Sequence, residues 1–69
     1  MDLAKIGKFI AERRKEQNLT QMQLAESLGI TDRAVSKWEN GTSDPSTSNL
    51  LALAKLYGVS AEEILSKIK

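Results

Sequence analysis

A group of polar residues in this chain has the spacing of one exposed helix face. Its members mostly recur every three or four residues, which places them on one side of an α-helix: Asp32, Arg33, Ser36, Lys37 and Asn40. They offer hydrogen-bond donors and acceptors rather than a nucleophile with its base. The chemistry that they favour is recognition, since a short polar helix face can read base edges in the major groove of DNA. The simpler interpretation is an ordinary solvated face.

Catalysis fits the remaining side chains poorly. The chain has no cysteine and no histidine, which removes disulfides, thiolate metal sites, the usual nucleophile-base pairs and the commonest metal ligand. The candidate acids are Glu12 with Glu16, and Glu62 with Glu63. The first pair follows one helix face among basic residues, and the second stands in a first helical turn, where acids stabilise the helix dipole. We therefore expect no enzyme, no cofactor and no metal site.

The net charge does not by itself indicate a nucleic-acid partner. Ten basic and nine acidic residues leave a charge of only +1. Cations are instead grouped locally, at Arg13, Arg14 and Lys15, and again at Arg33 and Lys37. No run approaches the roughly 20 apolar residues of a membrane span, and the first residues alternate charge with apolar side chains, unlike a signal peptide. We expect a cytoplasmic protein with no membrane partner and no small-molecule ligand.

Five short helices are predicted, because helix formers dominate and the chain has only one proline and four glycines. Breaks are expected at Gly29, Gly41, Pro45 and Gly58. The helices should cover residues of about 2–17, 21–28, 32–40, about 47–57 and 61–68. The predicted N-caps of the second, third and fifth helices are Thr20, Thr31 and Ser60. We expect residues 1–69 to form one compact all-α domain that rests on packing.

The second and third predicted helices carry the residue types needed by two helices that cross steeply over a tight turn. Ala25 stands at the expected point of closest approach, and Gly29 can take the positive φ of the turn. This helix-turn-helix arrangement leaves the polar face outside and favours DNA reading over a merely solvated face. The residues expected to point inward are Leu24, Leu28, Ile30, Val35 and Trp38.

Residues 20–46, TQMQLAESLGITDRAVSKWENGTSDPS, resemble the helix-turn-helix domains of phage repressors and Cro proteins, the XRE family. The similarity continues through residues 50–65, LLALAKLYGVSAEEIL, and so covers nearly the whole chain. The resemblance implies a lambda repressor-like fold and sequence-specific binding to double-stranded DNA as a small transcriptional regulator or repressor. Its distinguishing residues are Leu19-Thr20-Gln21, Leu24-Ala25, Leu28-Gly29, Val35-Ser36, Trp38-Glu39, Gly41 and Gly58-Val59-Ser60.

The resemblance also implies roles for individual residues. Arg14 and Glu39 fall where the family forms a partly buried ion pair between the first helix and the end of the recognition helix. Asp32 departs from the usual pattern, because an acid on this face is repelled by phosphates but can accept from a cytosine amino group. The positions that match base-reading residues are Thr31, Asp32, Arg33, Ser36 and Lys37, and those that match phosphate-binding residues are Gln21, Asn40 and Thr42.

Two expectations concern partners. One recognition helix contacts few base pairs, so we expect a two-fold dimer on a palindromic operator, weak or absent in free solution. The apolar surface left for such an interface should be Leu51, Leu56 and the fifth helix. The alternative is a protein-protein adaptor on the same fold, which the near-neutral charge favours. The donors at Gln21, Arg33, Lys37 and Asn40 argue against it.

Overall fold

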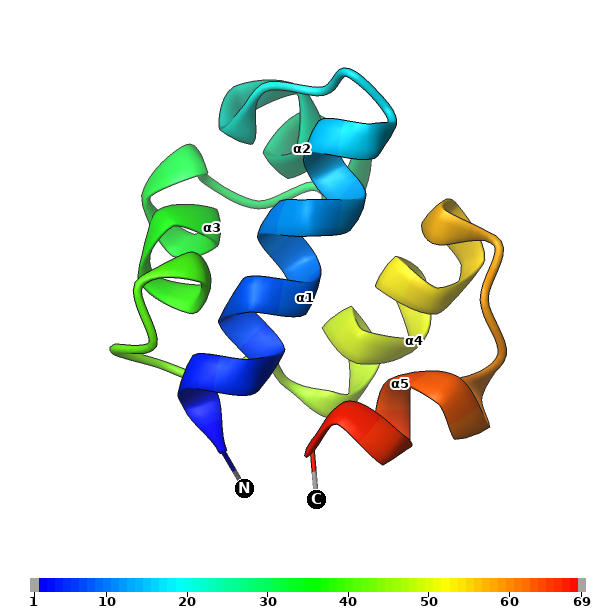
Figure 1. The fold of residues 1–69 in the computed structure, drawn as a ribbon. Coiled ribbons are helices and arrows are strands. Elements are labelled where there is room, and N and C mark those ends of the chain that lie inside the picture. The colour runs from blue at the N-terminus through cyan, green and yellow to red at the C-terminus, as the bar shows by residue number, and fades with distance from the viewer. Residues whose placement is uncertain (1, 69) are drawn as a thin grey trace.

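The computed structural model, which describes residues 2–68, consists of five helices joined by short connections (Figure 1). The helices are α1 (Leu3–Glu16), α2 (Gln21–Leu28), α3 (Asp32–Glu39), α4 (Thr47–Tyr57) and α5 (Ala61–Ile68). All five predicted helices are confirmed, each to within one residue at either end. None of the described helices combines the length and the apolar composition that a bilayer-spanning segment needs.

Side-chain caps fix where the helices begin. At α2, the Thr20 hydroxyl accepts from the Gln23 backbone N–H at 3.0 Å, while the Gln23 side chain accepts from the Thr20 N–H at 2.9 Å. This reciprocal capping box satisfies two backbone donors at once. Thr31 and Ser60 cap α3 and α5 through their side-chain oxygens, so the three predicted caps are confirmed. Two further caps, which the sequence analysis did not predict, are Asp2 and Ser46.

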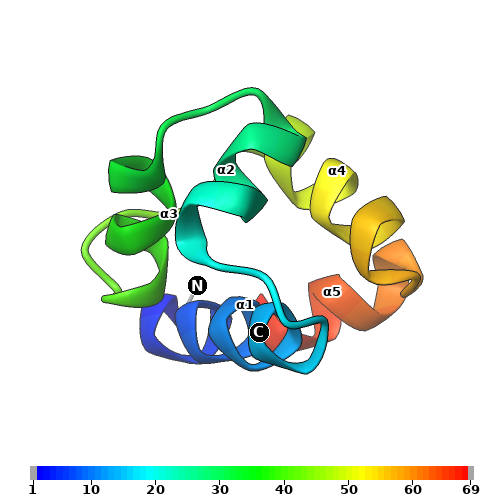
Figure 2. The same cartoon turned by 90° about the horizontal axis from the view of Figure 1, so that it is seen from above.

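In Figure 1, α1 crosses the molecule with α3 on one side and α4 and α5 on the other, and Figure 2 shows that it forms one edge of the bundle, opposite α2 and α4. It packs on α3 and α5, while α2 packs on α3 and α4. The five helices thereby share one core, to which every helix contributes. The buried apolar residues are Ile6, Phe9, Ile10, Leu24, Ala25, Val35, Trp38, Leu50, Leu53, Ala54, Tyr57 and Ile64.

The rim of the core agrees with the expectation in part. Leu28 and Ile30 pack against the core as predicted, although they are only partly buried. The prediction that Leu56 remains a free apolar surface is wrong, because it too packs against the core, three residues after the buried Leu53. Ile64 of α5 is 3% exposed and belongs to the core as well. Among the residues expected at a dimer interface, Leu51 is exposed.

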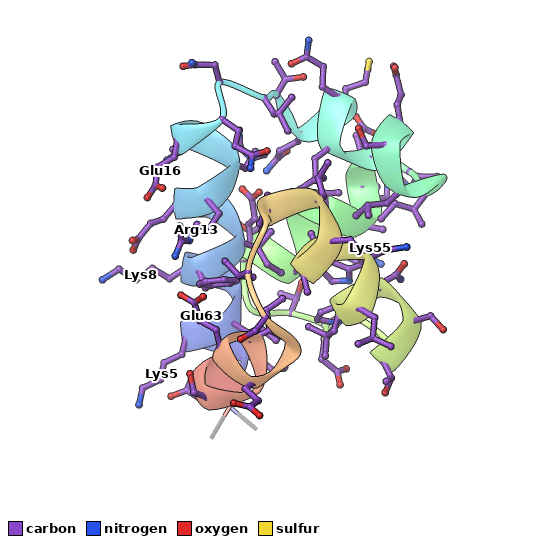
Figure 3. All side chains as sticks on the ribbon, turned by 90° about the vertical axis from the view of Figure 1, so that its right-hand side faces the viewer. Lys5, Lys8, Arg13, Glu16, Lys55 and Glu63 are labelled. Atoms are coloured by element: carbon purple, nitrogen blue, oxygen red, sulfur yellow. The ribbon has the colours of Figure 1, made fainter. Side chains whose placement is uncertain are left out.

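Arg13 attaches α5 to α1. Its guanidinium lies 5.5 Å from the centre of the Phe9 ring, and it donates to the Glu63 carboxylate at 3.1 Å. Figure 3 shows Arg13 and Glu63 pointing toward each other from the two helices. Arg13 also forms a looser ion pair with Glu16, at 3.6 Å along α1. The cation-π contact and the ion pairs are partly exposed, so each stabilises the domain by about 1 kcal/mol or less.

Candidate nucleic-acid interface

Helix α3 presents two rows of polar side chains to solvent. One row contains Asp32, Ser36 and Asn40, and the other contains Arg33 and Lys37, with a spacing of four residues in each. All except the half-buried Ser36 are exposed. The opposite side of the helix carries Val35 and Trp38, which are buried in the core. The structure therefore brings the predicted base-reading residues onto one face, and packing of the other face fixes its orientation.

The first row is acceptor-rich and the second is cationic. Among the described residues, Asp32, Arg33 and Lys37 form no ion pair and their side chains make no hydrogen bond within the chain. Asn40 reaches the Ser36 hydroxyl at 3.5 Å, a long contact that does not use up its amide. The face thus keeps its hydrogen-bonding capacity for an external partner.

The residues at the two ends of α3 are already hydrogen-bonded. Thr31 accepts from the Ala34 N–H at 3.2 Å, which leaves its own hydroxyl proton available. The Thr42 hydroxyl instead donates to the Lys37 carbonyl at 3.1 Å, and the Thr42 backbone N–H donates to the same oxygen at 3.0 Å. A phosphate accepts hydrogen bonds but cannot donate them at its ionised oxygens. Thr42 can therefore bind one only after its hydroxyl turns away from Lys37.

Gln21, the first residue of α2, is half-buried beside the end of α3. One of its amide hydrogens goes to Glu39, with an Nε2 to Oε1 distance of 3.0 Å. A carboxamide has two N–H donors, so one remains for a phosphate. The structure thus holds the predicted phosphate-binding amide at a fixed point, a relationship that the sequence analysis did not include.

Arg14 and Glu39 lie together beneath this site. Arg14 Nε donates to Glu39 Oε2 at 2.7 Å, and Nη2 donates to Oε1 at 3.1 Å. The third guanidinium nitrogen, Nη1, donates to the backbone carbonyl of Leu19 at 2.8 Å. The side chains are only 12% and 8% exposed, and the hydrogen bond to Glu39 raises the pKa of Arg14 above its ordinary value. This bidentate pair joins α1, the start of α2 and the end of α3.

Gly7 lets α1 approach the backbone of α3 more closely than any other residue would. A Cβ at this position would lie 2.3 Å from the Trp38 carbonyl oxygen and 2.9 Å from that of Glu39. Gly7 was not among the predicted residues, because it lies inside a helix rather than at a break. The available signal was the glycine itself, which lies in a helix interior three residues after the small Ala4. A glycine there lowers the stability of the helix, so its presence indicates that another part of the chain packs closely against it.

The charged side chains of α1 and α5 do not extend the polar face of α3. Figure 3 shows Lys5, Lys8 and Glu16 pointing outward from α1, away from the other helices. Of the carboxylates considered for catalysis, Glu16 and Glu63 are ion-paired to Arg13, while Glu12 and Glu62 are exposed on separate helices. Within residues 2–68, no cluster of three or more acidic, histidine or cysteine side chains is placed to hold a metal ion.

Comparison with known proteins agrees with this geometry. A family model described as helix-turn-helix matches residues 10–64 of the chain. The chain belongs to this helix-turn-helix family. It is 45% identical over 60 residues to the HTH-type transcriptional regulator DicA of Escherichia coli K12, covering 87% of this chain and 44% of the relative. It is 43% identical over 53 residues to the HTH-type transcriptional activator BcrR of Enterococcus faecalis, covering 77% of this chain and 26% of the relative.

A solved structure shares the same fold. The P22 c2 repressor protein in complex with a synthetic operator is 34% identical and superposes with a TM-score of 0.79, over 86% of this chain and 89% of that chain. The resemblance to phage repressors and XRE-type regulators is thereby confirmed, as is the all-α helix-turn-helix fold. The chain spans less than half the length of the two curated relatives.

Proposed function

We propose that this chain binds double-stranded DNA in a sequence-specific manner and serves as the DNA-binding part of a transcriptional regulator. The observation that carries the proposal is the exposed face of α3, on which the side chains of Asp32, Arg33 and Lys37 have no hydrogen-bond or ion-pair partner within the described residues. Helices α1 and α2 both pack on α3, and an α-helix is narrow enough to enter the major groove with its exposed face toward the bases. The relation to a repressor that is solved with its operator supports the same function.

Roles follow from where each side chain lies. Arg33 and Lys37 can donate to guanine edges, while Ser36 can donate or accept, and Thr31 stands at the edge of this face. Gln21, which is hydrogen-bonded to Glu39, and Asn40, the C-cap of α3, would bind phosphates at the C-terminal end of α3 and fix the register of the helix. Thr42 would join them once its hydroxyl is released from Lys37.

We also propose that the functional unit on DNA is a two-fold dimer. One α3 reads only a few base pairs, so a single half-site cannot be distinguished from the many competing sequences of a genome. Leu51, 54% exposed on α4, offers a small apolar contact, which fits a dimer that is weak in free solution. Inserting five base pairs between half-sites should abolish joint binding, since it rotates one half-site by half a turn. Equally tight binding to the spaced operator would contradict the dimer.

The regulator would act in the cytoplasm, where its DNA target lies, and would need no cofactor and no catalytic residue. The rival is a protein-protein adaptor that uses the same fold. The near-neutral charge of this chain is compatible with an adaptor. The unpaired donors of Arg33 and Lys37 on α3 argue against an adaptor, which has no need of them. Direct binding measurements separate the two functions.

The deciding experiment is a fluorescence anisotropy titration with random-sequence duplex DNA at rising salt, followed by selection of bound sequences. We expect binding at low salt with a shallow salt dependence, because only a few phosphates are contacted. Selection should then enrich one short motif. If the folded protein, verified by circular dichroism, forms no complex at low ionic strength, the DNA-binding function is refuted.

A further inference from the structure

The two rows on α3 differ in what they can read. The row of Arg33 and Lys37 contains only hydrogen-bond donors, while the neighbouring row begins with Asp32, whose carboxylate only accepts. We propose that Asp32 is a specificity-determining residue that accepts a hydrogen bond from the amino group of a cytosine, next to a guanine read by Arg33. This inference rests on the proposed DNA-binding function and names the bases of its site.

The surroundings of Asp32 leave its carboxylate free for this contact. It is the first residue of α3, it is exposed, and among the described residues it has neither an ion pair nor a side-chain hydrogen bond. The neighbouring Thr31 serves as the N-cap, so the Asp32 carboxylate makes no capping hydrogen bond, although as an acid in the first turn it also favours the helix dipole. Its cationic neighbours Arg33 and Lys37 do not neutralise it, because no ion pair forms within 4.0 Å.

The chemistry of the major groove selects cytosine among the four bases. Guanine and thymine present acceptors there, which repel a carboxylate. Adenine presents its N6 donor beside the N7 acceptor, so one of the two carboxylate oxygens would face another hydrogen-bond acceptor and be repelled by it. Cytosine presents only its N4 amino donor. A carboxylate at residue 32 therefore matches cytosine alone.

Arg33 supplies the complementary half of the contact. Its guanidinium matches the O6 and N7 acceptors of guanine, which stand beside the cytosine amino group in a G·C pair or in the neighbouring pair. An acid near phosphates weakens binding to every sequence, so its benefit is discrimination rather than affinity.

The test is to select bound sequences from a random duplex pool with the parent protein, Asp32→Asn and Asp32→Ala. The parent should enrich a motif with a cytosine whose replacement weakens binding roughly 5- to 150-fold, the range of a good base contact. Asp32→Asn should change the preference at that position to adenine, because a carboxamide matches both N6 and N7. Asp32→Ala should remove the preference there, and both variants should leave the rest of the motif unchanged.

Glu26→Gln is the matched control, since it removes the same charge from an exposed residue of α2. It should strengthen binding slightly to all sequences and leave the motif intact. If both Asp32 variants enrich the parent motif, or bind all sequences more tightly by one common factor, Asp32 does not read a base. That result would overturn this inference while DNA binding stands, whereas the failure of the parent to bind any duplex would refute the proposed function itself.

Discussion

Arg14 and Glu39 are joined by two parallel hydrogen bonds, of 2.7 and 3.1 Å, although 25 residues separate them in the sequence. The same carboxylate also accepts from Gln21 at 3.0 Å. One ion pair therefore fixes the end of α3 relative to α1 and positions the amide that stands at the start of α2. The pair links the stability of the domain to the geometry of its proposed DNA-binding face.

We expect Arg14→Ala and Glu39→Ala each to lower the free energy of unfolding severely. Removing one partner of a buried pair costs about 3–5 kcal/mol, and the slight exposure here places the loss at the lower end of that range. A domain of this size is stable by only roughly 4–10 kcal/mol. Arg13→Ala is the control, because its two ion pairs and its contact with the Phe9 ring are more exposed and their combined loss should cost about 1–2 kcal/mol. Thermal melts in which Arg14→Ala and Arg13→Ala behave alike would contradict a buried pair.

Gly7→Ala should destabilise the domain although alanine is the better helix former. Propensity alone would favour the variant by about 1 kcal/mol. The added Cβ would lie 2.3 Å from the Trp38 carbonyl oxygen, so α1 and α3 must separate, and overpacking of this kind costs about 1–3 kcal/mol or more. Chemical denaturation measures the sign of the net change. A variant more stable than the parent would show that the two backbones are not in close contact.

The stability of the domain should fall at alkaline pH because of Tyr57. Burial raises the pKa of the Tyr57 hydroxyl above its ordinary value of about 10, and the nearby Glu39 carboxylate raises it further. The unfolded state therefore releases its proton at a lower pH than the folded state. The stabilisation is fully present below about pH 10 and is lost as the pH rises from there toward the folded pKa.

Tyr57→Phe isolates this contribution, since Tyr57 is the only tyrosine of the chain. The variant loses the 3.0 Å hydrogen bond to the Ile10 carbonyl, which should cost about 0.5–1.5 kcal/mol at neutral pH. Its unfolding free energy should depend less on pH above 10 than that of the parent. Identical pH profiles for the two proteins would show that Tyr57 titrates normally.

Arg33→Ala and Gln21→Ala should weaken DNA binding in different ways. Arg33→Ala should cost roughly 1–3 kcal/mol on the selected motif and little on random DNA, because base contacts carry the sequence information. Gln21→Ala should weaken binding to both DNAs alike, since phosphate contacts are independent of sequence. Competition titrations with the two duplexes measure this difference. Equal losses on both DNAs for Arg33→Ala would argue against base reading.

The helices were predictable because their signals are local. Thr20 and Thr31 occur where a side-chain oxygen must meet a free backbone N–H, and Gly29 takes the positive φ that its turn needs, at +71°. The polar face of α3 followed in turn from the spacing of Arg33 and Lys37. Each of these inferences requires only residues within one or two helical turns.

The contacts between distant residues were not predictable from spacing. Arg14 and Glu39 were paired only through the family resemblance, and the hydrogen bond from Gln21 to Glu39 was not foreseen at all. Leu56 was misplaced because a residue at the border of a helix face can turn either way, and only the packing of α4 decides which. Gly7 was missed because the carbonyl groups that exclude a Cβ there belong to another helix.

The most direct test of the central claim is a map of amide chemical shifts in ¹⁵N-labelled protein as the selected duplex is added. We expect the largest changes at Gln21 and along the α3 face, around Arg33 and Lys37. The outer face of α1, where Lys5 and Lys8 point away from the other helices, should change little (Figure 3). Changes confined to that outer face, with α3 unaffected, would contradict DNA reading by α3.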